Sequence, residues 1–308
     1  MSENLKAFYT SLDQAYANGD KDDVEKLLLT QANDSCTSCD QFSEINLASI
    51  SELGAFYRGV SKYETSIRYF ESAADIIRRF LGEDSVEYAT NINNLAGTYR
   101  LMGNYEKALE LFLSAGKIYL KTVGESHYLY ACVLNNISLV YQDLRDFPQA
   151  VRYLLHSLEL IKIIPDSAEE LATGYSNLSS LYQQMGEYEK SYEALKKALK
   201  VISKQSPHYP AVLNNLAALQ FKNREYEKAK DTYLNVFENV QNFFGKSAEY
   251  AIACENLSSV YSRLDQPAKS LFYLTEARNT FEMVYGRNHE RFLRVDNEIK
   301  RREENLKK

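Results

Sequence analysis

Residues 93–115 read NNLAGTYRLMGNYEKALELFLSA and contain two short apolar patterns joined by a turn. Apolar residues recur here at spacings of three and four: Leu95, Tyr99, Ala108, Phe112 and Ala115. Such spacing places side chains on one face of an α-helix. Small alanines allow two helices to approach closely, and the large aromatic side chains fill the remaining gap. Gly103 suits the left-handed turn that ends a helix. The stretch therefore predicts a pair of amphipathic helices.

The same pattern occurs six times along the chain. The residue that closes the first helix recurs at intervals of about 42 residues, at Tyr57, Tyr99, Tyr141, Tyr182, Gln220 and Tyr261. The small residue in the second helix recurs with it, at Ser66, Ala108, Ala150, Ser191, Ala229 and Ser270. Connectors such as residues 81–85 combine a glycine that stops one helix with a serine that can cap the next. Six similar units predict a repeat array.

These residues resemble the tetratricopeptide repeat family, whose signature is the order Leu, small residue, Tyr, Gly, Tyr, Ala, Phe, Ala. The repeat length, the Asn-Asn-Leu-Ala blocks at 93–96 and 214–217, and the Leu-Gly-Glu-Asp connector are similar to the kinesin-light-chain subtype. The resemblance covers about residues 45–287 and implies an all-α, right-handed α-solenoid of helix-turn-helix units. Gln220, Arg224 and Pro267 depart from the pattern, so we expect less regular packing in the fifth and sixth repeats.

The two ends of the chain are expected to be caps. We predict an N-terminal helical hairpin and linker over residues 1–40, six repeats over 41–287, and a C-terminal capping helix over 288–308. Polar outer faces on such caps keep a repeat array from associating end to end. The final helix carries a stripe expected to pack on the last repeat, formed by Arg291, Phe292, Val295 and Ile299. We expect no independent second domain and favour a monomer over self-association through a cap.

Composition excludes several classes of function. The chain has 45% hydrophobic and 25% charged residues, which is typical of a globular protein. Its net charge of −6 argues against nucleic-acid binding, which needs a concentrated positive field. No apolar run approaches the roughly 20 residues that cross a bilayer, and the N-terminus lacks the long apolar core of a secretory signal. We therefore expect a cytoplasmic protein without a membrane partner.

The four cysteines do not form a recognisable framework. Cys36 and Cys39 lie close together, whereas Cys132 and Cys254 lie in helical patterns and are interpreted as small buried residues. A structural zinc site needs about four ligands, and the histidines occur singly. We interpret Cys36 and Cys39 as part of a polar linker, with a metal or redox role as the alternative. The absence of a disulfide framework is typical of a reducing cytosol.

The sequence contains no recognisable catalytic motif. There is no glycine-rich phosphate loop and no Gly-x-Ser-x-Gly elbow. Adjacent carboxylates such as Glu169 and Glu170 are typical of solvated helix faces. We therefore predict a protein that is not an enzyme and that needs no cofactor and no metal.

An asparagine column is the feature most informative about function. One residue before the repeated Leu or Ile of each first helix stand Asn94, Asn136, Asn177, Asn215 and Asn256, with Glu52 in the first repeat. The family resemblance implies that first helices line a concave groove, where such amides hold extended peptides. An amide offers two donors and an acceptor, so it can pair with a peptide backbone. Alternatively, these asparagines order the array through hydrogen bonds between neighbouring helices. We favour peptide contact.

Residues beside the column complete the predicted site. On one side lie Asn93, Asn135 and Asn214, and on the other Arg58, Arg100, Gln142, Gln183, Lys222 and Arg263. This polar groove, basic at both ends, favours a protein partner or an extended peptide that is polar or partly acidic. A hydrogen bond contributes about 1 kcal/mol net, while association costs on the order of 4–15 kcal/mol, so we expect micromolar affinity.

Two functions follow from this site. The first is a scaffold or adaptor that binds a protein segment in the groove. The alternative is a peptide-sensing regulator that controls a separate effector.

Overall fold

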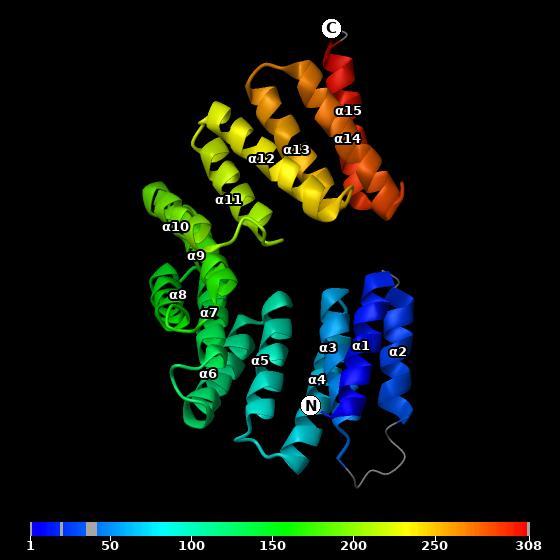
Figure 1. The fold of residues 1–308 in the computed structure, drawn as a ribbon, viewed down its shortest axis with the longest axis vertical. Coiled ribbons are helices and arrows are strands. Elements are labelled where there is room, and N and C mark those ends of the chain that lie inside the picture. Colours follow the sequence, from blue (N-terminus) through cyan, green and yellow to red (C-terminus); the bar gives the residue numbers. More distant parts are fainter. Residues whose placement is uncertain (1, 19–20, 35–41, 307–308) are drawn as a thin grey trace. The chain divides into compact units, whose positions relative to one another are not determined.

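The computed structural model describes residues 2–18, 21–34 and 42–306, and every regular element in them is a helix (Figure 1). The N-terminal hairpin is α1 (Glu3–Asn18) and α2 (Lys21–Asp34). The paired helices are α3 (Glu44–Gly59) and α4 (Tyr63–Phe80), α5 (Val86–Leu101) and α6 (Tyr105–Thr122), α7 (Tyr128–Asp143) and α8 (Phe147–Ile161), α9 (Ala168–Gln184) and α10 (Tyr188–Val201), α11 (Tyr209–Lys222) and α12 (Tyr226–Phe244), and α13 (Ala248–Arg263) and α14 (Pro267–Tyr285). The last helix is α15 (Glu290–Leu306). The all-α class and the six helix pairs are confirmed.

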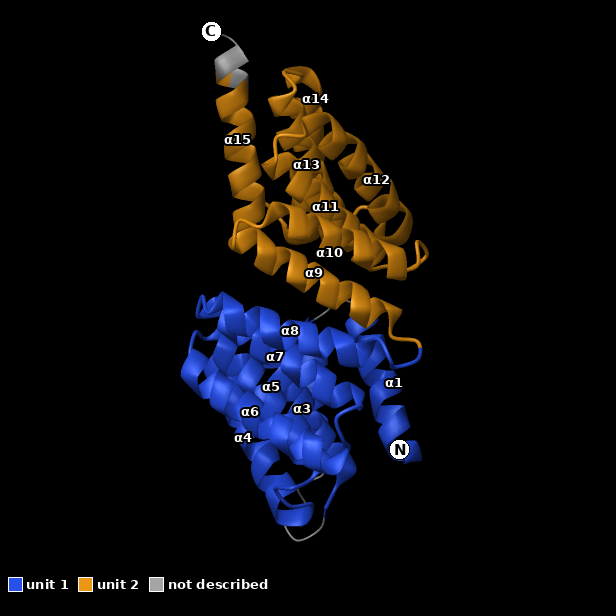
Figure 2. Ribbon diagram, turned by 90° about the vertical axis from the view of Figure 1, so that its left-hand side faces the viewer, with its two compact units in different colours: residues 1–165 blue, residues 166–308 orange. Residues whose placement is uncertain are grey.

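The chain divides into two compact units, residues 1–165 and residues 166–308 (Figure 2). The first contains α1 to α8 and the second α9 to α15. The boundary lies inside the range 41–287 that we predicted to be repeats, between the third and fourth helix pairs.

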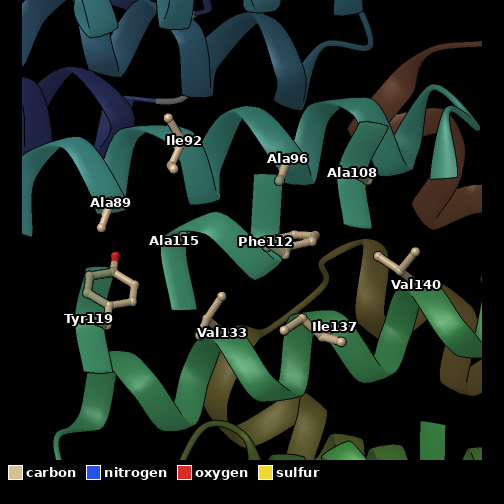
Figure 3. Packing of buried hydrophobic residues seen from close by; sticks show 10 residues of the cluster. All are labelled: Ala89, Ile92, Ala96, Ala108, Phe112, Ala115, Tyr119, Val133, Ile137 and Val140. Atoms are coloured by element: carbon tan, nitrogen blue, oxygen red, sulfur yellow. The ribbon is translucent and has the colours of Figure 1, made fainter. Parts of the chain in front are cut away.

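The core of the first unit follows the predicted alternation of large and small side chains. One cluster consists of Ala89, Ile92, Ala96, Ala108, Phe112, Ala115, Tyr119, Val133, Ile137 and Val140. Phe112 of α6 lies between Ala96 of α5 and Ile137 of α7 (Figure 3). Because the neighbouring alanines are small, one aromatic ring can pack against residues of all three helices. This packing fixes the relative positions of α5 and α7.

A second cluster attaches the N-terminal hairpin to the first repeat. Phe8, Leu12, Val24 and Leu28 of the hairpin are buried with Leu53, Phe56 and Tyr57 of α3. The predicted hairpin is therefore present, and it covers the apolar face that α3 would otherwise leave open.

The turn inside each repeat has the same backbone conformation whatever its sequence. A residue with positive φ occupies the same place in all six turns, at Ser61, Gly103, Arg145, Gly186, Arg224 and Asp265. The next backbone N–H donates to the carbonyl of the residue that closes the first helix, as from Asn104 to Tyr99 at 2.9 Å and from Glu225 to Gln220 at 2.9 Å. Such a bond satisfies a carbonyl left free at a helix C-terminus.

The fifth and sixth repeats form the same helix pairs as the others. The three residues that depart from the repeat pattern, Gln220, Arg224 and Pro267, each fit the structure. Gln220 is buried, and its Oε1 accepts a 2.8 Å hydrogen bond from the Thr232 hydroxyl. Arg224 adopts the turn conformation. Pro267 is the first residue of α14, where its missing N–H breaks no helical hydrogen bond.

The final helix packs on the last repeat as predicted. Phe292, Val295 and Ile299 are buried, and α15 contacts α14. The same spacing that relates successive repeats relates Ile299 to Leu257 of α13, so α15 corresponds to the first helix of a further repeat. Arg302 of α15 donates through Nη1 to the hydroxyls of Ser270 at 2.5 Å and Ser258 at 3.1 Å.

Candidate binding surface on the first helices

The predicted column lies at the edge of the core in both units. In the first unit, Glu52, Asn94 and Asn136 are half-buried, and each directly precedes a buried Leu or Ile. In the second unit, the half-buried members are Asn177, Asn215 and Asn256. A residue next to a core position on a helix points partly outward, so these side chains border solvent and can meet a ligand.

Five of the predicted residues converge on one pocket of the first unit. Arg58, Asn93, Asn94, Arg100 and Asn136 line it together with Gly97 and Phe112. Its volume is about 220 Å³. A Cβ at Gly97 would lie 3.2 Å from Nη1 of Arg58, so the glycine leaves room for that guanidinium. We call this site the arginine pocket.

Arg58 is held in place by contacts with Asn94 and Phe70. Its Nη1 donates to the backbone carbonyl of Asn94 at 3.1 Å, and its guanidinium lies 5.8 Å from the centre of the Phe70 ring. Burial lowers the pKa of Arg58, while the nearby Glu52 carboxylate opposes this change. An arginine stays charged at neutral pH and carries five N–H donors. The arginine pocket therefore contains an oriented cation with donors left for a ligand.

The second arginine of the pocket is partly neutralised. Nε of Arg100 donates to Oδ2 of Asp143 at 2.7 Å. Both side chains are largely covered, with 26% and 31% of their surface exposed. Gln142, beside Asp143 at the end of α7, is half-buried. This end of the surface is therefore less basic than the sequence alone suggests.

Asparagines of successive repeats form hydrogen bonds with each other. Nδ2 of Asn136 donates to Oδ1 of Asn93 at 3.0 Å in the first unit. Nδ2 of Asn256 donates to Oδ1 of Asn214 at 2.8 Å in the second. The architectural role of the column requires such bonds. Each bond occupies one N–H of its donor, and an amide has a second N–H and an oxygen, so a ligand can still be bound.

The remaining predicted residues are dispersed in their units. Asn135 of α7 is half-buried, and Arg263 of α13 is exposed. Gln183 donates weakly to the Ser179 hydroxyl at 3.4 Å. The Lys222 ammonium lies 5.2 Å from the centre of the Tyr188 ring.

In the second unit, the carboxylate of Glu255 binds an arginine of the final helix. Nη2 of Arg294 in α15 donates to both oxygens of Glu255, at 2.8 and 2.9 Å. Burial raises the pKa of Glu255, although Arg294 and Arg291 act in the opposite direction. The capping helix therefore covers part of the first-helix surface of the last repeat.

Sequence reasoning missed a larger pocket of about 630 Å³ in the first unit, bordered by α1, α3, α4 and α5. Its polar residues include Glu44, Glu52, Glu87, Asn91 and Asn94. Glu52 was the available signal, because it breaks the asparagine column at this place. We call this site the glutamate pocket.

The two cysteines within the described residues differ in burial. Cys36 and Cys39 lie outside the described residues. Cys254 is buried as predicted, and burial together with Glu276 raises the pKa of its thiol to about 12, which leaves it a poor nucleophile at neutral pH. Cys132 is only partly buried. Residues 2–18, 21–34 and 42–306 contain no group of three or more metal-ligating side chains.

No helix in the described part of the chain has the length and apolar character needed to cross a membrane.

Solved structures with this fold span most of the chain. BtubC (BKLC) from P. vanneervenii, which has a kinesin-light-chain-like fold, is 20% identical, with a TM-score of 0.57 over 64% of this chain and 79% of that one. A Rap protein complexed with Competence and Sporulation Factor is 14% identical, with a TM-score of 0.63 over 99% and 88% of the two chains. The apo quorum sensor NprR from B. thuringiensis is 13% identical, with a TM-score of 0.54 over 89% and 86%. At these identities the likeness establishes the fold alone.

A search of curated protein sequences finds no match. The sequence profile described as "Tetratricopeptide repeat" matches residues 46–121, 91–163, 129–204 and 208–283, which together exceed half of the chain. The chain therefore belongs to the tetratricopeptide repeat family.

Proposed function

We propose that this protein is a non-enzymatic interaction module, a scaffold or adaptor that binds an extended protein segment along its first helices. The observation that carries the proposal is the arginine pocket. Arg58, Asn94, Arg100 and Asn136 come from three successive repeats and line one small polar cavity. Repeat arrays use such laterally extended surfaces to hold elongated partners.

The side chains of the arginine pocket indicate which chemical groups of the bound segment it accepts. Arg58 supplies a fixed positive charge with free donor capacity, and the asparagines supply amide donors and acceptors. Backbone amides of an extended peptide, or a carboxylate side chain, satisfy both kinds of group. The segment is therefore polar or partly acidic where it crosses the pocket. Each contact contributes about 1 kcal/mol, so the affinity is expected to be micromolar.

Two column residues allow the ligand role to be separated from the architectural role. Within the described residues, the side chains of Asn94 and Asn215 form no hydrogen bond. Asn93 and Asn214, by contrast, accept hydrogen bonds from asparagines of the next repeat. The variant Asn94→Ala/Asn215→Ala therefore removes amides that bond to no described residue. Asn214→Ala removes an amide that joins two repeats, and Asn214, unlike Asn93, does not line the arginine pocket.

The test is an affinity capture from source lysate read by mass spectrometry, with wild type and both variants as baits. We expect Asn94→Ala/Asn215→Ala to melt like the wild type and to lose partners. We expect Asn214→Ala to melt earlier and to retain most partners below its melting temperature. If all three folded baits retain the same proteins, the first helices do not form the binding surface.

A regulator that binds a peptide and controls a separate effector is the second candidate. It is supported by two structures of the same fold, the quorum sensor NprR and a Rap protein bound to Competence and Sporulation Factor. Small-angle scattering with and without a captured segment tests it. A ligand that leaves the scattering profile unchanged argues for the adaptor.

A further inference from the structure

The glutamate pocket combines apolar walls with an acidic lining. It lies between α1 and the N-terminal ends of α3 and α5, with the C-terminal end of α4 behind it. Its apolar walls include Leu5, Tyr9, Leu47, Ile77, Leu81 and Val86. A volume of about 630 Å³ is within the range of pockets that bind small molecules or side-chain groups.

Three carboxylates line the glutamate pocket, and among the described residues no lysine, arginine or histidine does. Glu44 accepts a 2.8 Å hydrogen bond from the Ser2 hydroxyl, and Glu87 is exposed in the first turn of α5. Glu52 is half-buried and forms no hydrogen bond or ion pair with any described residue. Burial and the nearby Asp13 raise the pKa of Glu52, and Arg58 opposes them. The site therefore contains an incompletely compensated negative charge.

A buried acceptor in the wall also lacks a donor. Asn91 is only 4% exposed, and its Nδ2 donates to the Phe70 carbonyl at 2.8 Å. Its Oδ1 is buried and has no hydrogen-bond partner among the described residues. Buried polar atoms are normally paired, so this oxygen points to an occupant that brings an N–H group.

The arginine pocket and the glutamate pocket differ in charge and meet at Asn94, which lines both. On one side of Asn94 the arginine pocket offers Arg58 and Arg100. On the other side the glutamate pocket offers Glu52 and Glu87. A segment lying across Asn94 would therefore experience a positive field at one end and a negative field at the other.

We propose that the glutamate pocket receives a lysine or arginine side chain, with an adjacent apolar side chain, from the segment that binds along the first helices. The long apolar stem of such a residue packs on the walls while its charged head reaches Glu52 and Glu87. Its N–H groups supply donors to Glu52 and to the Asn91 oxygen. An acidic side chain is repelled here, so the pocket fixes the direction of the segment. This inference rests on the proposed function for the source of the side chain, but not for the chemistry of the pocket.

The chemistry is tested directly with two small probes, N-acetyl-leucyl-arginine amide and N-acetyl-leucyl-citrulline amide. They have nearly the same shape, but only the arginine carries a charge. The full chain is labelled at its Ile, Leu and Val methyl groups, and each probe is titrated by NMR. We expect saturable shifts at the methyls of Leu47, Ile77 and Val86, with the citrulline probe binding about tenfold more weakly.

Charge-removing variants complete the test. Glu52→Gln and Glu87→Gln are each expected to weaken the arginine probe about three- to tenfold. Glu249→Gln is the matched control, because Glu249 occupies the first turn of α13 as Glu87 does in α5, and it should leave binding unchanged. Equal binding of both probes, or shifts outside the pocket, overturns the inference. If the arginine probe binds as expected while the capture experiment fails, the cation pocket stands and the segment-binding function falls.

Discussion

Asn136 donates a 3.0 Å hydrogen bond from Nδ2 to Oδ1 of Asn93, its neighbour one repeat earlier. The same bond joins Asn256 to Asn214 at 2.8 Å in the other unit. In each unit, therefore, one member of the asparagine column links its helix to the first helix of the preceding repeat. Ligand contact has to use the remaining atoms of these amides and the column members outside the pairs.

A double-mutant cycle measures how much this hydrogen bond contributes to the free energy of unfolding. We expect Asn93→Ala and Asn136→Ala each to lower the free energy of unfolding, with a coupling of roughly 0.5–1 kcal/mol between them. The measurement is urea denaturation followed by circular dichroism. The pair Asn93→Ala and Asn256→Ala serves as the control, because these residues belong to different units and should be additive. A coupling of zero in the first cycle would mean that the amide pair adds nothing to stability.

Two glycines of α3 predict opposite effects of the same substitution. A Cβ at Gly54 would lie 2.8 Å from the Phe70 ring, and Phe70 is fully buried. We expect Gly54→Ala to destabilise the fold by about 1–3 kcal/mol through overpacking, despite the better helix propensity of alanine. Nothing lies within 4 Å of a Cβ at Gly59, so Gly59→Ala should be neutral or stabilising by up to about 1 kcal/mol. The melting temperatures of both variants test this prediction. Equal shifts in melting temperature would contradict the close contact between Gly54 and Phe70.

The repeated turn predicts a stabilising substitution. Arg145 is exposed and has φ of 61°, a conformation that costs a residue with a Cβ roughly 1–2 kcal/mol. Arg145→Gly relieves that strain but adds freedom to the unfolded chain, so we expect a net gain of about 0.5–1 kcal/mol. Gly103, with φ of 86° and open space around it, provides the reverse test. Gly103→Ala should lower the melting temperature, and a rise would show that the turn tolerates side chains.

Glu52 predicts a pH-dependent change in stability. The pKa of its carboxyl is raised above the ordinary value of 4.5, so the folded state binds this proton more tightly than the unfolded state does. Ionisation of Glu52 therefore lowers stability as the pH rises through the ordinary value and up to the raised one. We expect Glu52→Gln to stabilise the protein at pH 7 by roughly 0.5–1 kcal/mol, allowing for partial solvent screening.

The stabilising effect of Glu52→Gln should disappear below pH 4, where the wild-type carboxyl is also neutral. Denaturation at pH 7 and pH 3.5 provides the comparison. Glu87→Gln, at an exposed position of the same pocket, should show little difference at either pH. A Glu52→Gln variant that is less stable than wild type at pH 7 would indicate a favourable ion pair instead of an uncompensated charge.

Periodicity was sufficient to predict the helices, because the same core positions recur in every repeat. Leu95, Phe112 and their counterparts define both helices of each pair and the distance between them. The turn conformation was foreseeable only at Gly103 and Gly186. Elsewhere Arg145 and Arg224 adopt it because the backbone hydrogen bonds and the two packed helices impose it.

The site was harder to predict than the fold. Repetition placed Asn93 and Asn136 at equivalent positions of successive repeats, but side-chain rotamers decide that their amides meet. The break in the asparagine column at Glu52 marked the place of the glutamate pocket, but it could not predict the pocket's other walls. The pocket is assembled from Leu5 of the N-terminal hairpin, from Ile77 at the end of α4 and from Glu87 of the next repeat, which follow three different patterns.

The division after Pro165 has a consequence for synthesis of the chain. Residues 1–165 contain a complete set of helix pairs with their own buried cores, and the ribosome delivers this half first. The pairings that close it join residues roughly one repeat apart, as between Asn93 and Asn136, and short loops close quickly. The first half can therefore reach its native contacts, with the arginine pocket and the glutamate pocket formed, while the second half is still being translated.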